Sequence, residues 1–490
     1  MRSAKSFANG WILCGALIVL AGWLYVSPGR VEAQSAGNNA IYNSIGGIIG
    51  SGSFIDASVL PSTTNTDICS RIQSALATIN KNIGSAVIDA RGINSGNSNM
   101  TCAQSPWINL NPIPDSIILL PAGTITLASG SNWVVPNQTR LIGEGTGASG
   151  TSVTTVQAGS GFSGAMIQMG WNSATPPSHY SIDPCPSGGG GWVCFGISIE
   201  DLTLNGAGLA SVGILNENSQ EHSYVARVSM YQIPGTGLQI GGAGQNGNGC
   251  CQAQNSGPYS NILVAPGTSA TANTVCAEVL GQPDTRGIHG ITCVANGTPA
   301  AAILLDSDNT TIEDAHLDGF HDGILVGSQA SATNNVQSNV LFNITGSVDS
   351  GPMTNLIHIS KASPGNTTDL TILGATSMHD ASGNPSNTIQ DDETGTAGTT
   401  LSFSTDAHVG MYVLGQPMSG SASSTEYSRF TTSPTVPTWG EGSLSLTITG
   451  KACGSVGALF SNTAGGSGGM NTLFACVPSS STVNSWQPIK

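Results

Sequence analysis

A short pattern that recurs along the middle of the chain constrains its fold more than any other feature. Between about residues 196 and 400, a polar residue or glycine precedes an apolar–variable–apolar triplet, at intervals of about 24 to 34 residues. The residues that open the triplets are Asp201, Arg227, Asn261, Gly290, Asp314, Asn339 and Asp369. Alternating apolar side chains predict strands with one buried face. Asn, Asp and Gly suit a bend because they tolerate a left-handed backbone.

A second short strand follows most triplets, as in Gly213-Ile214-Leu215 and Gly323-Ile324-Leu325-Val326. No amphipathic helix of ten or more residues separates these strands, which argues against alternating strand–helix units. Stacked coils have such repeats, because one coil cannot bury its own apolar face and neighbouring coils share one interior. A propeller is the main alternative, but its blades need about 40 residues and antiparallel hairpins. We therefore expect an all-β protein, a right-handed parallel β-helix.

The ends of the predicted solenoid differ from its middle. Residues 67–80 predict a helix that Asp67 caps, and such a helix would cover the open edge of the first coil. Its apolar face comprises Ile68, Ile72, Leu76 and Ile79.

We divide the chain into a signal peptide (1–33), an irregular lead-in (34–66), the capped β-helix (67–414), a Ser/Thr/Pro-rich linker (415–440) and a small C-terminal β module or cap (441–490).

The first residues predict export. Arg2 and Lys5 precede an apolar run from Trp11 to Val26, and Val31-Glu32-Ala33 offers small side chains for cleavage. This order is typical of a secretory signal. An uncleaved anchor is the alternative, although the run has about 16 residues where a membrane span needs about 20. We expect a secreted or cell-surface protein.

The charge balance limits the partners. Charged residues make up 8% of the chain, and 28 acidic residues outnumber 13 basic ones. Such a surface disfavours nucleic acid and anionic lipid. We expect neither a nucleic-acid partner nor a membrane contact after removal of the signal.

The cysteines predict disulfides. Eleven become ten once Cys14 leaves with the signal, and an even number suits an oxidising compartment. Their grouping pairs Cys69 with Cys102, Cys185 with Cys194, and Cys453 with Cys476. Two further bonds are expected among Cys250, Cys251, Cys276 and Cys293. Zinc is the alternative, but no pair has the two-residue gap of zinc knuckles.

Three segments resemble the pectate-lyase superfamily: residues 117–124 (IILLPAGT), 141–145 (LIGEG) and 196–204 (GISIEDLTL). The resemblance covers about residues 54–400 and implies a right-handed parallel β-helix, a fold that carries lyases, hydrolases, adhesins and inert surface proteins. Polygalacturonase-like members carry Asn-x-Asp, Asp-Asp, Gly-His-Gly and Arg-x-Lys in that order. Here Asp322 matches only the Asp of the first motif. Residues 287–290 (GIHG) match the third motif loosely, but they precede Asp322 in the chain, and Arg-x-Lys is absent.

Candidate catalytic residues lie near the second strands. Adjacent coils lie about 4.8 Å apart, so outward side chains on successive coils form ladders. We predict Asp322 and Asp306 as the acid/base or nucleophile pair, with His358 beside them. One coil of separation would suit a retaining glycosidase and two an inverting one. Surface turn residues are the alternative reading of these acids. The expected substrate-binding residues are His321, Asp308 and Lys361.

These features predict an exported polysaccharide-interacting protein, with glycoside hydrolysis by the carboxylates as the first hypothesis for its chemistry. A non-catalytic surface protein or adhesin is the alternative from another class. A Ca²⁺-dependent polysaccharide lyase is a second alternative, in which acidic side chains would supply oxygen ligands. No other metal or cofactor is predicted.

Overall fold

The structure is a computed structural model, and the part it describes is given by the following residues. They are 52–62, 64, 66–79, 85–94, 99–110, 113–147, 152–170, 187–188, 191–192, 194–242, 253–281, 284–328, 336–360, 367–368, 370–377, 387–391, 413–414, 439–442, 459–462, 472–478 and 484–488. Residues 1–50 and 51–490 form two compact units, so all described residues belong to the second. Within this part of the chain, no helix has both the length and the apolar character needed to cross a membrane.

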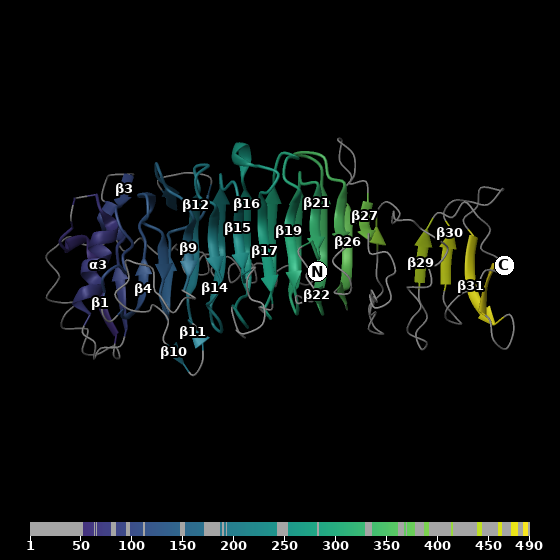
Figure 1. The fold of residues 1–490 in the computed structure, drawn as a ribbon, viewed down its shortest axis with the longest axis horizontal. Coiled ribbons are helices and arrows are strands. Elements are labelled where there is room, and N and C mark those ends of the chain that lie inside the picture. The colour runs from purple at the N-terminus through teal and green to yellow at the C-terminus, as the bar shows by residue number, and fades with distance from the viewer. Residues whose placement is uncertain are drawn as a thin grey trace, which may run out of the picture. The chain divides into compact units, whose positions relative to one another are not determined.

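Parallel strands dominate the fold and build two sheets (Figure 1). The 15-stranded sheet A comprises β1 (Gly52–Asp56), β2 (Ser85–Asp89), β3 (Asn99–Cys102), β4 (Asp115–Leu119), β5 (Gly123–Leu127), β7 (Thr139–Ile142), β8 (Thr154–Ala158), β12 (Ser198–Asn205), β14 (Tyr224–Tyr231), β16 (Tyr259–Ala265), β18 (Ile288–Val294), β20 (Thr311–Asp318), β23 (Val340–Ser347), β26 (Thr371–Ser377) and β28 (Val413–Leu414). The 9-stranded sheet B comprises β6 (Trp133–Val135), β9 (Ala165–Met169), β13 (Val212–Asn216), β15 (Thr236–Ile240), β17 (Val275–Gly281), β19 (Ala301–Ser307), β21 (Asp322–Val326), β24 (Asn355–Ile359) and β27 (Asn387–Asp391). From β12 onward the chain alternates between the sheets, which confirms the predicted parallel β-helix.

Smaller elements accompany these sheets. Two short pairs are β10 (Ser187–Gly188) with β11 (Gly191–Trp192), and β22 (Val336–Gln337) with β25 (Thr367–Thr368). A separate four-stranded sheet comprises β29 (Trp439–Gly442), β30 (Leu459–Asn462), β31 (Thr472–Pro478) and β32 (Asn484–Pro488), and its last two pairings are antiparallel. The 3-10 turns are η1 (Ala57–Val59), η2 (Arg91–Asn94) and η3 (Gly267–Ser269).

Each rung, meaning one turn of the coil, contains three straight segments. Near the N-terminus they are separate strands, such as β7, β8 and β9. In the next rung β12 replaces the first two: residues 198–200 pair with β7, and residues 203–205 pair with β8. Asp201, which lies between these halves, has φ of 56°. One residue with a left-handed backbone therefore replaces the longer connection between β7 and β8.

The left-handed bend recurs in six successive strands of sheet A. It lies at Asp201, Arg227, Asn261, Gly290, Asp314 and Asn343, with φ between 53° and 74°. Five of these residues are the predicted bends, and each lies inside a strand. Asn339 lies directly before β23, between strands as predicted, but it is not the left-handed residue of this strand. Its buried side chain accepts from the Thr310 amide (2.9 Å) and donates to the Ser307 carbonyl (2.7 Å). Asp369 lies outside the described residues.

The predicted capping helix is present as α3 (Ile68–Thr78), at the purple end of the coil in Figure 1. Asp67 caps it by accepting from the Ser70 amide at 3.2 Å. A disulfide between Cys69 and Cys102 ties the helix to β3. Strand β1 begins at Gly52 and pairs with β2, so regular structure starts inside the range predicted as an irregular lead-in.

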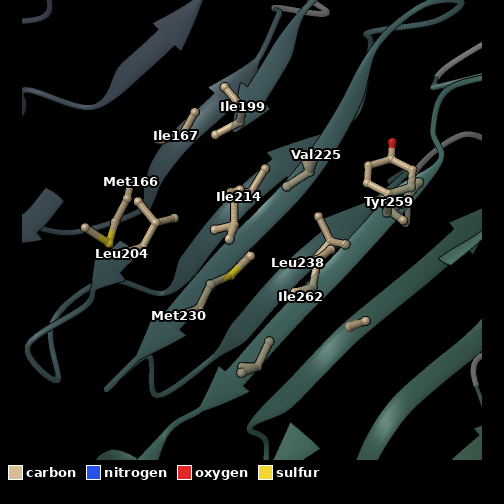
Figure 2. Close-up of a cluster of buried hydrophobic side chains, with 14 of the residues drawn as sticks. Met166, Ile167, Ile199, Leu204, Ile214, Val225, Met230, Leu238, Tyr259 and Ile262 are labelled. Atoms are coloured by element: carbon tan, nitrogen blue, oxygen red, sulfur yellow. The ribbon is translucent and has the colours of Figure 1, made fainter. Parts of the chain in front are cut away.

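Stacked apolar side chains fill the interior of the coil. Figure 2 shows Ile199, Val225 and Tyr259 following one another on successive rungs, and their backbones are paired in register. Sheet B contributes a facing row that includes Ile214 and Leu238. All five side chains are completely buried. The coil therefore owes its stability to contacts between rungs, as in other solenoids.

The bend at Asn261 gives a test of the left-handed row. This residue is exposed and has φ of 54°. Asn261→Ala should lower the free energy of unfolding by about 1–2 kcal/mol, because a left-handed conformation costs an alanine roughly that much. Asn261→Gly should cost far less, since glycine adopts the conformation freely. Urea denaturation of both variants checks this, and equal losses of stability would contradict the assignment.

Candidate functional site

The predicted site residues Asp322, His321 and His358 lie together on sheet B. Asp322 begins β21 and is paired with Asn355, which begins β24 on the next rung. The Asp322 carboxylate lies 3.1 Å from His321 Nδ1 through Oδ1 and 2.8 Å from His358 Nδ1 through Oδ2. Asn355 Nδ2 donates to Oδ1 at 2.7 Å. Two adjacent rungs thus build one polar cluster around a single carboxylate.

Burial differs among the members of this cluster. The Asp322 side chain is 7% exposed, that of His358 19%, and that of His321 59%. A carboxylate removed from water needs hydrogen-bond donors, and the two imidazoles and the amide supply them. The arrangement therefore holds a buried acceptor beneath an exposed imidazole.

The carboxylate also fixes the tautomers of both histidines. An ionised carboxylate only accepts, so each Nδ1 that bonds to Asp322 carries a proton. In a neutral ring the proton-accepting nitrogen is then Nε2. A carboxylate that orients imidazole in this way makes it a general base or, once protonated, a general acid.

Asp306 lies elsewhere, so the predicted pair Asp322–Asp306 is wrong. The register pairs Asp322 with Ala301, and Asp306 lies five residues further along β19. At about 3.3 Å per residue the two backbones are about 16 Å apart along the strand direction, too far for a glycosidase pair. Asp306 is buried, and its Oδ2 accepts from Ser328 Oγ at 2.9 Å.

Asp308 is also remote from Asp322, because it lies in the turn after β19. Burial, together with the negative charge of Asp284 from the preceding rung, raises the pKa of Asp308 to about 6. Asp284 is held by Gln254 Nε2 (3.1 Å) and Asn309 Nδ2 (2.5 Å). These two acids are turn residues of neighbouring rungs. The substrate-binding prediction at Lys361 falls outside the described residues.

The cysteines agree with the disulfide predictions only in part. The bond between Cys69 and Cys102 is present, and Cys194 is disulfide-bonded. Cys276 and Cys293 are instead free thiols in the interior, so for them the prediction is wrong in this structure. They fill the core there as small apolar side chains. Cys185, Cys250, Cys251 and Cys453, and the side chain of Cys476, lie outside the described residues.

Two polar clusters on the outer side of sheet A were not predicted. In the first, Glu200 accepts from Arg140 Nη2 (2.7 Å), Tyr224 Oη (2.8 Å), Ser198 Oγ (2.9 Å) and Arg227 Nη2 (3.1 Å). Burial acts to raise the pKa of Glu200, but these donors outweigh it and lower the pKa. Both arginines have carboxylate partners, so the cluster joins β7, β12 and β14 and has the features of a structural brace.

The second unpredicted cluster pairs His289 with Glu313 on the next rung. His289 Nδ1 lies 2.7 Å from Glu313 Oε2, and His289 Nε2 lies 2.8 Å from the Arg286 carbonyl. Only the loose match of residues 287–290 to Gly-His-Gly pointed to His289 in the sequence. Over the described stretch of chain, no three His, Cys, Asp or Glu side chains are grouped so as to hold a metal ion.

Asp308 gives a pH-dependent test. With its pKa raised to about 6, the folded state keeps a proton that the unfolded chain loses near pH 4. Stability should therefore fall as pH rises through this window. Asp308→Asn should raise the free energy of unfolding by about 1–2 kcal/mol at about pH 8 and bring no gain below about pH 4. Thermal melts at both pH values measure this, and a gain independent of pH would contradict it.

Comparison with known proteins adds little to this geometry. No family model matches the chain, and no curated protein sequence matches it. Among solved structures, ORF18 of Geobacillus virus E2 aligns at 12% sequence identity with a TM-score of 0.28. The alignment covers 72% of this chain and 63% of that one, and a similarity of this degree says nothing about activity or substrate. The chain is mostly parallel β, with two parallel sheets stacked as in a β-helix.

Proposed function

We propose that the chain is an exported polysaccharide-cleaving β-helix protein whose acid–base centre is the cluster of His321, Asp322 and His358. The observation that carries this proposal is the buried Asp322 carboxylate, which bonds the Nδ1 atoms of two histidines on adjacent rungs. One imidazole would act as base through Nε2, and the other, once protonated, as acid. An extended ligand such as a polysaccharide suits a site on the long side of a solenoid.

The bond changes of the proposed hydrolysis balance as follows. The basic imidazole takes a proton from water, and the water oxygen bonds to the anomeric carbon. The glycosidic carbon–oxygen bond breaks, and the leaving oxygen takes the proton of the imidazolium. Asp322 stays ionised throughout and stabilises the imidazolium that forms, as a buried carboxylate does beside histidine in other acid–base sites.

Export and family membership belong to the same proposal. The disulfides at Cys69, Cys102 and Cys194 support an oxidising compartment, as the predicted signal peptide does. The resemblance of residues 117–124 and 196–204 to the pectate-lyase superfamily supports membership in it. Both are consistent with a polysaccharide as substrate.

Asp322→Asn tests the centre. It should lower kcat by about 100-fold or more, because an amide neither stabilises an imidazolium nor fixes both tautomers. His358→Gln should cause a similar loss. The purified protein would be incubated with a panel of neutral and acidic polysaccharides, with and without Ca²⁺. Reducing ends would report hydrolysis, and ultraviolet absorbance of an unsaturated product would report elimination.

His316→Gln is the matched control, because His316 lies on β20 of sheet A, where it is paired with Thr292 and Thr345 and not with any residue of the cluster. It should cleave like the parent. Cleavage that persists in Asp322→Asn would contradict the assigned centre. Unsaturated products would show that the reaction is elimination and not hydrolysis. If no polysaccharide of the panel is cleaved, a non-catalytic surface protein is favoured.

A further inference from the structure

An exposed aromatic side chain lies beside the His289–Glu313 pair on sheet A. Phe342 is 41% exposed although it lies in the middle of β23. The register pairs it with Glu313 on β20, which is paired in turn with His289 on β18. Paired positions of parallel strands share a face about 4.8 Å apart, so the three side chains form a row across three rungs. The apolar residues that flank Phe342 along the strand behave differently, since Leu341 and Ile344 are fully buried.

The carboxylate in this row is held in one orientation. A carbonyl oxygen only accepts, so the bond to Arg286 puts a proton on His289 Nε2. On its other side the ring contacts Glu313, and its Nδ1 holds one carboxylate oxygen at 2.7 Å. About a third of the Glu313 side chain, 35%, remains exposed next to Phe342.

A second carboxylate, that of Asp314, lies next to Glu313, at the left-handed bend of β20. Asp314 follows Glu313 and is exposed, and its Oδ1 accepts from Asn343 Nδ2 at 2.6 Å. Glu313 and Asp314 supply two carboxylates to this surface, and His289 is the single imidazole beside them. The surface thus combines an aromatic face, oriented hydrogen-bond acceptors and a net negative charge.

We propose that Phe342, Glu313 and Asp314 form a second carbohydrate-binding surface, which takes neutral pyranose residues without cleaving them. The apolar face of a sugar ring would stack on Phe342, and its hydroxyl groups would donate to the carboxylates. The net negative charge disfavours uronic acids, because like charges repel. This inference rests on the proposed function for the class of ligand, but it concerns a separate sheet and needs no cleavage.

Electrophoresis of the full secreted chain through gels that contain soluble polysaccharide would measure the binding. The panel would contain neutral glucan, mannan, xylan and galactan, and acidic polygalacturonate and alginate. Neutral glycans should retard the parent. Phe342→Ala should weaken that affinity about tenfold or more, since it removes the stacking face. Phe342→Trp should restore it, and Glu313→Gln should weaken it several-fold.

Phe54→Ala is the matched control, because Phe54 is 44% exposed in the middle of β1, at the other end of sheet A. It should bind like the parent, and thermal melts would establish that each variant is folded. Equal affinity of Phe342→Ala and the parent, retardation by acidic glycans alone, or no retardation would each overturn the inference.

Asp322→Asn separates the two proposals. In the Asp322→Asn variant, neutral glycan should still retard the protein, and adding Phe342→Ala should remove this retardation. That result would support the second surface whether or not the parent cleaves polysaccharide. Cleavage that depends on Asp322 without any effect of Phe342→Ala would leave the proposed function standing and remove this inference.

Discussion

In six successive rungs a single residue with a left-handed backbone turns each strand of sheet A from one side of the coil to the next. This bend replaces the separate strands and longer connections of the first rungs, such as residues 143–153 between β7 and β8. A conformation that ordinary side chains disfavour must be supported by its neighbours. Arg227 makes two hydrogen bonds to Asp201, and Asn343 makes one to Asp314. The bend thus also creates the outward row of polar residues.

Inside the coil, the same stacking demands that large and small side chains alternate between the sheets. A Cβ atom on Gly237 of sheet B would lie 2.8 Å from Val264 Cγ1 of sheet A. Further along, the roles reverse: a Cβ atom on Gly346 of sheet A would lie 2.6 Å from Leu356 Cδ1 of sheet B. Close packing leaves no room for two large residues at one level, so each rung is matched to the next.

This reversal explains where the sequence pattern predicted the fold and where it failed. Asp201, Asn261 and Asp314 were recognisable because an apolar triplet follows each of them. After Asn343 the third position of the triplet is Gly346, whose space Leu356 fills, so no apolar triplet marks this bend and the pattern points to Asn339 instead. The sequence pattern indicates which positions face inward, but it does not show where a large side chain of one sheet fills the space left by a glycine of the other.

The candidate site shows the same limit on the outside of the coil. Sequence order alone placed Asp306, Asp322 and His358 on one ladder, but whether their side chains meet depends on how far apart they lie along the strands. His358 lies three residues along the strand from the partner of Asp322 and its ring still reaches the carboxylate, whereas Asp306 lies five residues away. Register, which depends on the length of every intervening turn, therefore decides which polar residues meet. Here it brings two histidines to one carboxylate on sheet B and keeps Asp306 and Asp308 away from it.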